Sequence, residues 1–119
     1  MKKTLVLGAS PNSARYAYLA TALLKEYKHE VIPYGVRKGA IEGQPIVNEL
    51  PSDKDIDTVT VYLNPLNQKP YYDYVMNLHP KRVVFNPGTE NPEFEKMLAD
   101  KGIHALEACT LVLLRTGQY

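Results

Sequence analysis

The chain has 119 residues, of which 45% are hydrophobic, so a single domain of this length can bury an apolar core without disulfides or metal ions. Lys and Arg total 14 against 13 Asp and Glu, and the resulting net charge of +1 argues against the broadly basic face that binds bulk nucleic acid. Cys109 is the single cysteine and cannot form an intrachain disulfide, and no apolar stretch reaches the ~18 residues of a membrane span, so a cytoplasmic protein is expected.

The first half of the chain alternates between predicted strands and a helix. Residues 4–8 form a continuous apolar run, which is typical of a parallel strand covered on both faces. A helix then begins at a cap on Asn12 or Ser13, and its apolar stripe consists of Tyr16, Ala20, Leu23, Leu24 and Tyr27. A short strand follows at residues 30–33, and regularly placed glycines and prolines predict loops over residues 35–57.

The second half of the chain carries three more predicted strands, at residues 58–63, 82–85 and 103–107. A helix is expected near residues 67–78, with an inner face formed by Tyr71, Tyr74, Val75 and Leu78. Another helix begins at Asn91 as cap with Pro92 in its first turn, and it ends at Gly102. Residues 109–114 fit a short helix or a strand, and periodicity does not decide between them.

Five strands that alternate with helices predict a Rossmann-like, three-layer α/β/α fold with a five-stranded parallel sheet, in one domain spanning residues 1–119. The expected strand order is 3-2-1-4-5. Ligands of such sheets bind outside the carboxyl ends of the strands, at the point where the order reverses, here between the first and fourth strands. The loops that follow the strands are therefore the candidate binding site.

The loop after the first strand is a candidate phosphate site. A strand that turns sharply into a helix presents free backbone N–H groups at the positive end of the helix dipole. Small residues let a ligand approach the backbone, and Arg15 can reach back to a phosphate, although the single glycine departs from the G-x-G-x-x-G pattern. The alternative is an ordinary turn with a surface arginine. The candidates in this loop are Gly8, Ala9, Ser10, Asn12, Arg15 and Tyr16.

The loop after the second strand lacks the acidic residue that binds the ribose hydroxyls in NAD-binding domains. Pro33 and Tyr34 stand at that point, and Arg37 and Lys38 follow. Two cations in place of an acid favour a ribose that carries an extra phosphate, which both NADP and coenzyme A have. The alternative is a solvated basic loop. Tyr34 is also a candidate for stacking on adenine.

Two further loops end strands beside the expected crevice, and each also fits simple turn chemistry. Their candidate residues are Leu63, Asn64 and Pro65 in one loop and Asn86, Pro87 and Gly88 in the other. No catalytic or metal site is predicted, because the histidines at positions 29, 79 and 104 fall outside the loops and no nucleophile–base spacing is present. Cys109 is interpreted as a small core residue, with a thiol that forms a mixed disulfide with coenzyme A as the alternative.

Nearly the whole chain resembles the small CoA-binding-domain family, the stand-alone relatives of a domain in the succinyl-CoA synthetase α subunit and in ADP-forming acyl-CoA synthetases. No one motif carries the resemblance, which rests on the order and spacing of several. These are Val6–Asn12 with Arg15 and Tyr16, Glu30–Pro33, Ile41–Gly43, Phe85–Glu90 and Glu107–Thr110.

The resemblance implies that coenzyme A is the ligand, that the first loop holds its phosphates, and that Lys38-Gly39 takes the place of a Lys-Gly pair that holds the 3′-phosphate. Pro33-Tyr34-Gly35-Val36 departs from the Pro-Val-Asn-Pro of many relatives, which leaves the choice between Arg37 and Lys38 open. We expect no counterpart of the synthetases' phosphohistidine domain or nucleotide-grasp subunit within these 119 residues.

Three interpretations follow from these patterns. The first is a coenzyme A or acyl-CoA binding module without catalytic activity of its own. The second is an NADP-binding or other nucleotide-binding redox sensor. The third is a subunit of a CoA ligase or transferase whose catalytic part is elsewhere, which requires a protein partner of unknown identity.

Overall fold

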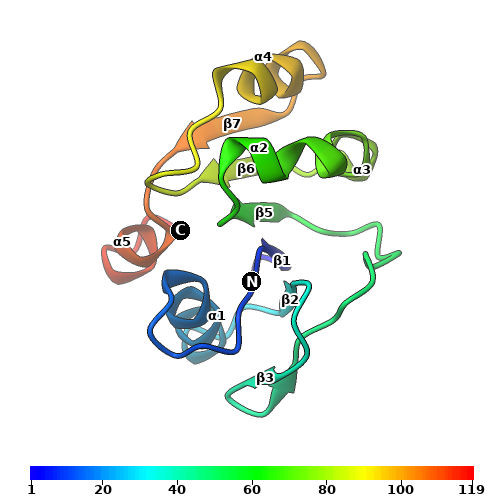
Figure 1. The fold of residues 1–119 in the computed structure, drawn as a ribbon. Helices are drawn as coiled ribbons and strands as arrows, with labels where there is room; N and C mark the ends of the chain where they lie inside the picture. The colour runs from blue at the N-terminus through cyan, green and yellow to red at the C-terminus, as the bar shows by residue number, and fades with distance from the viewer.

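A computed structural model describes residues 1–119 and places five parallel strands in one sheet (Figure 1). The order across this sheet is β2-β1-β5-β6-β7. A short antiparallel hairpin lies apart from it, in the segment that the sequence marks as irregular. The strands of the sheet are β1 (Thr4–Leu7), β2 (Val31–Tyr34), β5 (Thr58–Val61), β6 (Arg82–Phe85) and β7 (His104–Glu107), and the hairpin strands are β3 (Ala40–Ile41) and β4 (Gln44–Pro45).

The Rossmann-like, doubly wound arrangement that the sequence predicts is confirmed, with the reversal of strand order at β1. Beyond β2 the sheet continues only as an isolated parallel bridge between Tyr34 and Val47. With this segment counted as the third strand along the chain, the order is 3-2-1-4-5-6, which contains the 3-2-1-4-5 pattern. One assignment differs: Thr58–Val61 pairs with β1 rather than lying beyond β2, so the reversal falls between β1 and β5. Sequence periodicity detects runs of residues, and a strand reduced to one bridge leaves no such signal.

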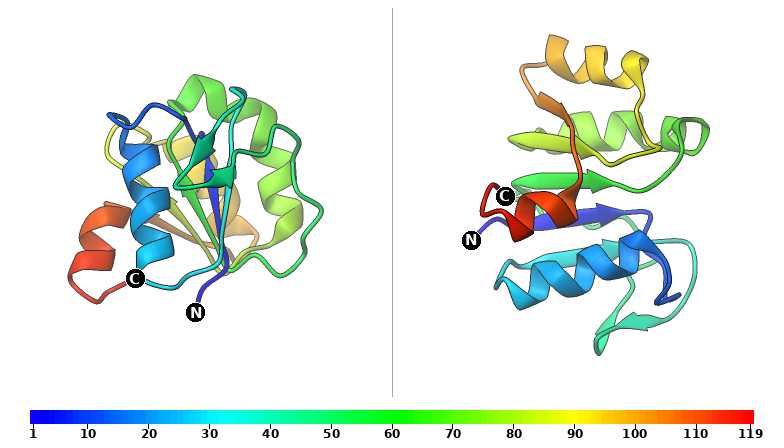
Figure 2. Two further views of the ribbon diagram at one scale, coloured as in Figure 1. Left: turned by 90° about the horizontal axis from the view of Figure 1, so that it is seen from below. Right: turned by 90° about the vertical axis from the view of Figure 1, so that its left-hand side faces the viewer.

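Helices cover both faces of the sheet (Figure 2). One face carries α1 and α5, and the other carries α2, η1, α3 and α4. The carboxyl-terminal segment, for which the sequence left helix and strand open, forms the helix α5. None of the helices has the length and apolar character needed to span a lipid bilayer. The bounds are α1 (Tyr16–Glu26), α2 (Pro65–Gln68), η1 (Lys69–Tyr71), α3 (Tyr72–Leu78), α4 (Pro92–Asp100) and α5 (Thr110–Arg115).

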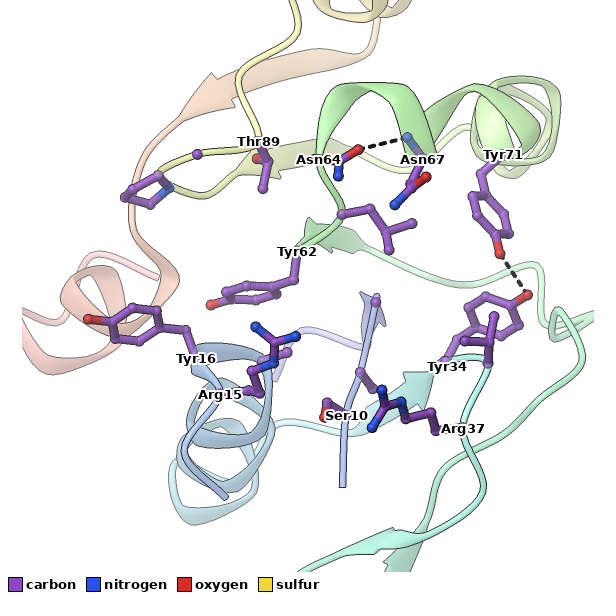
Figure 3. Close-up of a pocket in the computed structure, with 18 of the residues that line it drawn as sticks. Ser10, Arg15, Tyr16, Tyr34, Arg37, Tyr62, Asn64, Asn67, Tyr71 and Thr89 are labelled. Carbon is purple, nitrogen blue, oxygen red and sulfur yellow. Dashed lines mark hydrogen bonds between the residues drawn. The ribbon is translucent and has the colours of Figure 1, made fainter. Parts of the chain in front are cut away.

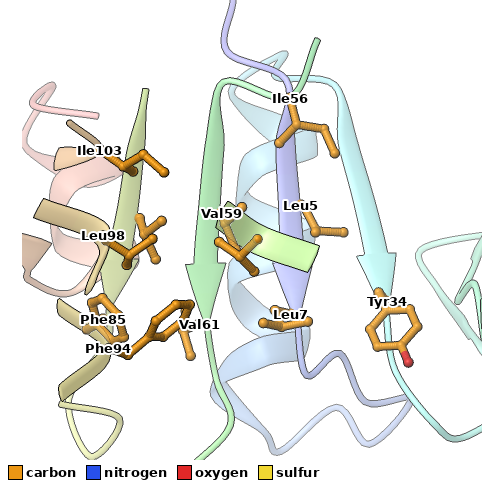
Figure 4. Packing of buried hydrophobic residues seen from close by; sticks show 12 residues of the cluster. Leu5, Leu7, Tyr34, Ile56, Val59, Val61, Phe85, Phe94, Leu98 and Ile103 are labelled. Carbon is orange, nitrogen blue, oxygen red and sulfur yellow. The ribbon is translucent and has the colours of Figure 1, made fainter. Parts of the chain in front are cut away.

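Alternating side chains of the central strands divide the core into two clusters. Leu5 and Leu7 face the α2–α4 side and belong to a cluster of 12 buried residues (Figure 4). Val6 points to the opposite face and packs with α1 and α5 in a cluster of nine. Because every β1 residue is buried, this strand is held from both sides and fixes the position of the loop that follows it.

The second half follows the predicted helix starts closely. Asn91 Oδ1 accepts a hydrogen bond from the Phe94 N–H at 3.1 Å, which confirms Asn91 as the cap of α4. The helix expected near residues 67–78 begins two residues earlier, at Pro65, and is interrupted by η1. Pro70 explains the interruption, because it has no N–H to continue the helical hydrogen bonds.

The start and the buried face of α1 differ from expectation. The helix begins at Tyr16, and no side chain caps it. Asn12 instead accepts a hydrogen bond from the Ala14 N–H within the preceding loop. Tyr16 is 71% exposed and Tyr27 40% exposed, because smaller side chains pack against the sheet in place of the tyrosines. The buried residues of α1 are Ala17, Ala20, Thr21 and Leu24.

Candidate functional site

A cleft of about 620 Å³ lies at the carboxyl ends of β1, β2, β5 and β6, where the strand order reverses (Figure 3). Its walls come from the loop after β1, the start of α1, the loop after β2, and the segments after β5 and β6. The candidate residues that line it are Gly8, Ala9, Ser10, Arg15, Tyr16, Tyr34, Arg37, Leu63, Asn64, Pro87 and Gly88. The topology thus brings together side chains from four loops that are far apart in sequence.

Five candidate residues do not line the cleft. Pro33 is buried within β2, opposite Val6, and Pro65 forms the first turn of α2. The Asn12 side chain accepts a hydrogen bond from the Ala14 N–H within its own loop. Lys38 is exposed outside the cleft, whereas the neighbouring Arg37 lies along its wall.

Asn86 is the fifth, and its role differs from the predicted ligand contact. Its side chain is buried, and Nδ2 donates hydrogen bonds to Thr60 Oγ1 at 2.7 Å and to the Val61 carbonyl at 2.9 Å. Oδ1 accepts from the Thr110 N–H at 2.9 Å. Both amide protons and the amide oxygen are therefore used inside the protein, and Asn86 holds the Pro87 loop in place.

The loop after β1 leads into the start of α1, where two backbone N–H groups have no acceptor within the protein. Gly8, at φ +105°, turns the chain so that the N–H groups of Gly8 and Ala9 both donate to the Tyr34 carbonyl, at 3.0 and 2.7 Å. The first N–H groups of α1, those of Tyr16 and Ala17, have no acceptor within the protein. Such donors, together with the positive end of an 11-residue helix, favour an anion at this position.

The loop after β2 lies directly against the loop after β1. A Cβ atom on Gly35 would stand 2.2 Å from the Ala9 carbonyl oxygen, so this contact requires glycine. Gly39 approaches Pro11 in the same way, with a hypothetical Cβ 2.6 Å from the proline Cβ. The two loops that carry the cationic residues are therefore fixed relative to each other.

The charge of the cleft is wholly positive. Arg15 and Arg37 enter it from the loops after β1 and β2 (Figure 3), and no aspartate or glutamate lines it. The ion pairs of the protein are formed by Lys3, Lys81 and Lys96, so neither arginine is neutralised by a carboxylate. Two unpaired guanidinium groups suit a ligand with more than one phosphate.

Tyrosines form the two ends of the cleft, and sequence reasoning missed two of them. The hydroxyls of Tyr34 and Tyr71 are hydrogen-bonded at 3.0 Å, with their rings edge-to-face at 5.6 Å (Figure 3). Burial and then this hydrogen bond raise the pKa of Tyr34 to about 12, so the hydroxyl is neutral at physiological pH. Tyr62 lines the opposite end beside Tyr16, and burial also raises its pKa.

The remaining residues that line the cleft gave little signal in the sequence. Asn67 and Thr89 belong to segments that the sequence predicts as helix and turn, and Tyr71 was assigned to the inner face of a helix.

Cys109 and the three histidines lie outside the residues that line the cleft. Cys109 is half-buried at the start of α5, and His29 accepts a hydrogen bond from the Lys2 N–H while burial lowers its pKa.

Comparison with known proteins assigns the chain to a family. Residues 2–115 match the CoA binding domain family. The chain belongs to that family. No curated protein matches the sequence. An uncharacterized protein of known crystal structure is 53% identical to this CoA binding domain, with a TM-score of 0.97 and coverage of 100% of this chain and 98% of the other.

Two other solved structures extend the comparison. A Thermus thermophilus protein is 27% identical to this CoA binding domain, with a TM-score of 0.85, and the match covers 99% of this chain and 90% of the other. A dinucleotide-forming acetyl-coenzyme A synthetase 1 from Ca. Korarchaeum cryptofilum, in complex with phosphate and ADP, has a TM-score of 0.72 at 18% identity. That match covers 89% of this chain but 25% of the synthetase and is a likeness of fold.

Proposed function

We propose that the cleft binds coenzyme A, free or acylated, and that the protein is a binding module rather than a complete enzyme. The observation that carries the proposal is the pair of unpaired arginines at the uncapped start of α1 and on the loop after β2, in a cleft without a carboxylate. Coenzyme A has phosphates at two separate places, the diphosphate and the ribose 3′-position. Membership of the CoA binding domain family supports this ligand.

Each arginine has a proposed role. Arg15 and the free N–H groups of Tyr16 and Ala17 bind the diphosphate, since helix N-termini favour phosphate. Arg37 binds the 3′-phosphate, since it follows β2 where dinucleotide-binding domains recognise the ribose. Lys38 is exposed outside the cleft, which favours Arg37 over the pair Lys38-Gly39 for this role.

Replacing Arg37 with alanine is expected to weaken coenzyme A binding by roughly ten- to a hundredfold, the value of a charge-assisted hydrogen bond. Dephospho-coenzyme A lacks the 3′-phosphate, so its affinity is expected to change little. Titration calorimetry of both ligands measures the difference. Lys38→Ala is the matched control and leaves both affinities nearly unchanged, because this cation lies outside the cleft.

The Arg15→Ala variant separates the two phosphate contacts. Both forms of coenzyme A share the diphosphate, so both affinities are expected to fall together. Equal losses for the two ligands in Arg37→Ala, or a larger selective loss in Lys38→Ala, would contradict the assignment of Arg37. Tighter binding of NADP than of coenzyme A by the unmodified protein would favour the second interpretation, because NADP carries a ribose phosphate of its own.

The isolated protein is expected to show no acyl-CoA hydrolysis, ligation or hydride transfer. The ionisable side chains that line the cleft are arginines and tyrosines, which supply no nucleophile–base pair. Enzyme assays with repurified protein, with an Arg15→Ala sample as the binding-deficient control, check this. Turnover above roughly 1 s⁻¹, at the low end of ordinary enzymes, that is lost in the control would contradict the proposal of a binding module without catalytic activity of its own.

A further inference from the structure

The loop that carries Arg37 into the cleft has no regular secondary structure, yet one side chain outside the cleft holds it. Asn48 Nδ2 donates hydrogen bonds to the Gly35 carbonyl at 2.8 Å and to the Arg37 carbonyl at 3.0 Å. The two protons of one amide group thus bind carbonyls on both sides of Val36. Asn48 does not line the cleft and has no role in the proposed ligand contacts.

The backbone beside Asn48 is itself fixed to the sheet. The Gly35 N–H donates to the Val47 carbonyl at 3.1 Å, and the Val47 N–H donates to the Pro33 carbonyl at 2.9 Å. The Asn48 amide is therefore anchored to the outermost part of the sheet. From there it turns the carbonyls of Gly35 and Arg37 toward itself, while the Arg37 side chain lies along the cleft (Figure 3).

We propose that Asn48 is a positioning residue that selects for a ligand with a ribose 3′-phosphate by holding Arg37 in the cleft. This inference rests on the proposed function, because it concerns the phosphate that Arg37 binds. A loop already held in its binding conformation does not lose conformational entropy when the ligand binds. Without the Asn48 amide, the ligand itself must order the loop.

Replacing Asn48 with alanine removes both donors and adds no charge. The affinity for coenzyme A is expected to fall about five- to tenfold, while that for dephospho-coenzyme A is expected to change little. Titration calorimetry measures both. Asn77→Ala, at an exposed asparagine on α3, is the matched control and leaves both affinities unchanged. A general loss of folding would move the two ligands together, so the ratio of affinities distinguishes positioning from stability.

A double-mutant cycle identifies the residue through which Asn48 acts. In an Arg37→Ala background, Asn48→Ala is expected to cause no further loss of coenzyme A affinity. The same loss in both backgrounds would overturn the inference, and so would equal losses for the two ligands. If Asn48→Ala unfolds, Asn48→Ser is measured in the same way and with the same expected direction.

A measurement without ligand separates this inference from the proposed function. Trypsin cleaves after Arg37 and Lys38, and Asn48→Ala is expected to be cut there at least several times faster than the unmodified protein or Asn77→Ala. Unchanged cleavage would overturn the role of Asn48 even if coenzyme A binds. Faster cleavage together with no coenzyme A binding by the unmodified protein would instead overturn the proposed function and, with it, the selection for the 3′-phosphate.

Discussion

Coenzyme A, at a hundredfold excess over its dissociation constant, is expected to raise the melting temperature of the protein by roughly 10 °C. The cleft forms where four loops meet at the ends of parallel strands, so the unfolded chain does not contain it. A ligand that binds only the folded state adds RT ln(1 + [L]/Kd) to the free energy of unfolding, about 2.7 kcal/mol at this excess. Differential scanning fluorimetry or calorimetry measures the shift.

Matched ligands and variants assign the thermal shift to the cleft. Pantetheine lacks the nucleotide and both phosphate positions, so at the same concentration it is expected to leave the melting temperature unchanged. The Arg15→Ala variant is expected to lose most of the shift at a fixed ligand concentration, while Lys38→Ala keeps it. No shift in melting temperature with millimolar coenzyme A would contradict the proposed ligand. A larger shift with NADP than with coenzyme A would indicate that NADP is the ligand instead.

Local rules predicted much of the fold. Asn91 and Pro92 identify the start of α4 because a cap and a proline act on the first turn alone. The strands are continuous apolar or β-branched runs, which need no knowledge of distant residues. The reversal of strand order at β1, and with it the position of the cleft, follows from strand–helix alternation and general rules of topology.

Features that depend on distant partners were not visible in the sequence. Arg37 and Lys38 are adjacent and similar in charge, and the loop held by Asn48 and Val47 decides which of them lies along the cleft. Tyr71 lines the cleft, and its hydroxyl is hydrogen-bonded there to that of Tyr34, which is 37 positions away in sequence. These contacts join residues that are far apart in the sequence, and neither periodicity nor turn chemistry indicates such a partner.

Asn86 shows the same limit at a buried position. It precedes Pro87-Gly88 at the end of β6, which made it a reasonable ligand contact from sequence. Its partners Thr60 and Thr110 lie 26 and 24 positions away, on β5 and at the start of α5. A polar residue at the end of a strand can face a ligand or the interior, and only the arrangement of three separate elements decides which.

Replacing Asn86 with alanine is expected to lower the free energy of unfolding by about 3 kcal/mol, or on the order of 10 °C in melting temperature. The substitution removes three hydrogen bonds and leaves the Val61 carbonyl and the Thr110 N–H without this partner in the interior. Urea unfolding is expected to show a lower midpoint with an unchanged m-value, since the same surface becomes exposed.

The matched control for Asn86 is Asn67→Ala, because Asn67 is an exposed asparagine whose side chain makes no hydrogen bond in the protein. Its substitution is expected to change the free energy of unfolding by less than about 0.5 kcal/mol.

The Asn86→Asp variant keeps an acceptor for the Thr110 N–H but loses both donors, so an ionised carboxylate would face the Val61 carbonyl in the interior. It is expected to be no more stable than Asn86→Ala at neutral pH. Stability equal to that of the unmodified protein in either Asn86 variant would show that the hydrogen bonds of this amide do not hold the cleft loop.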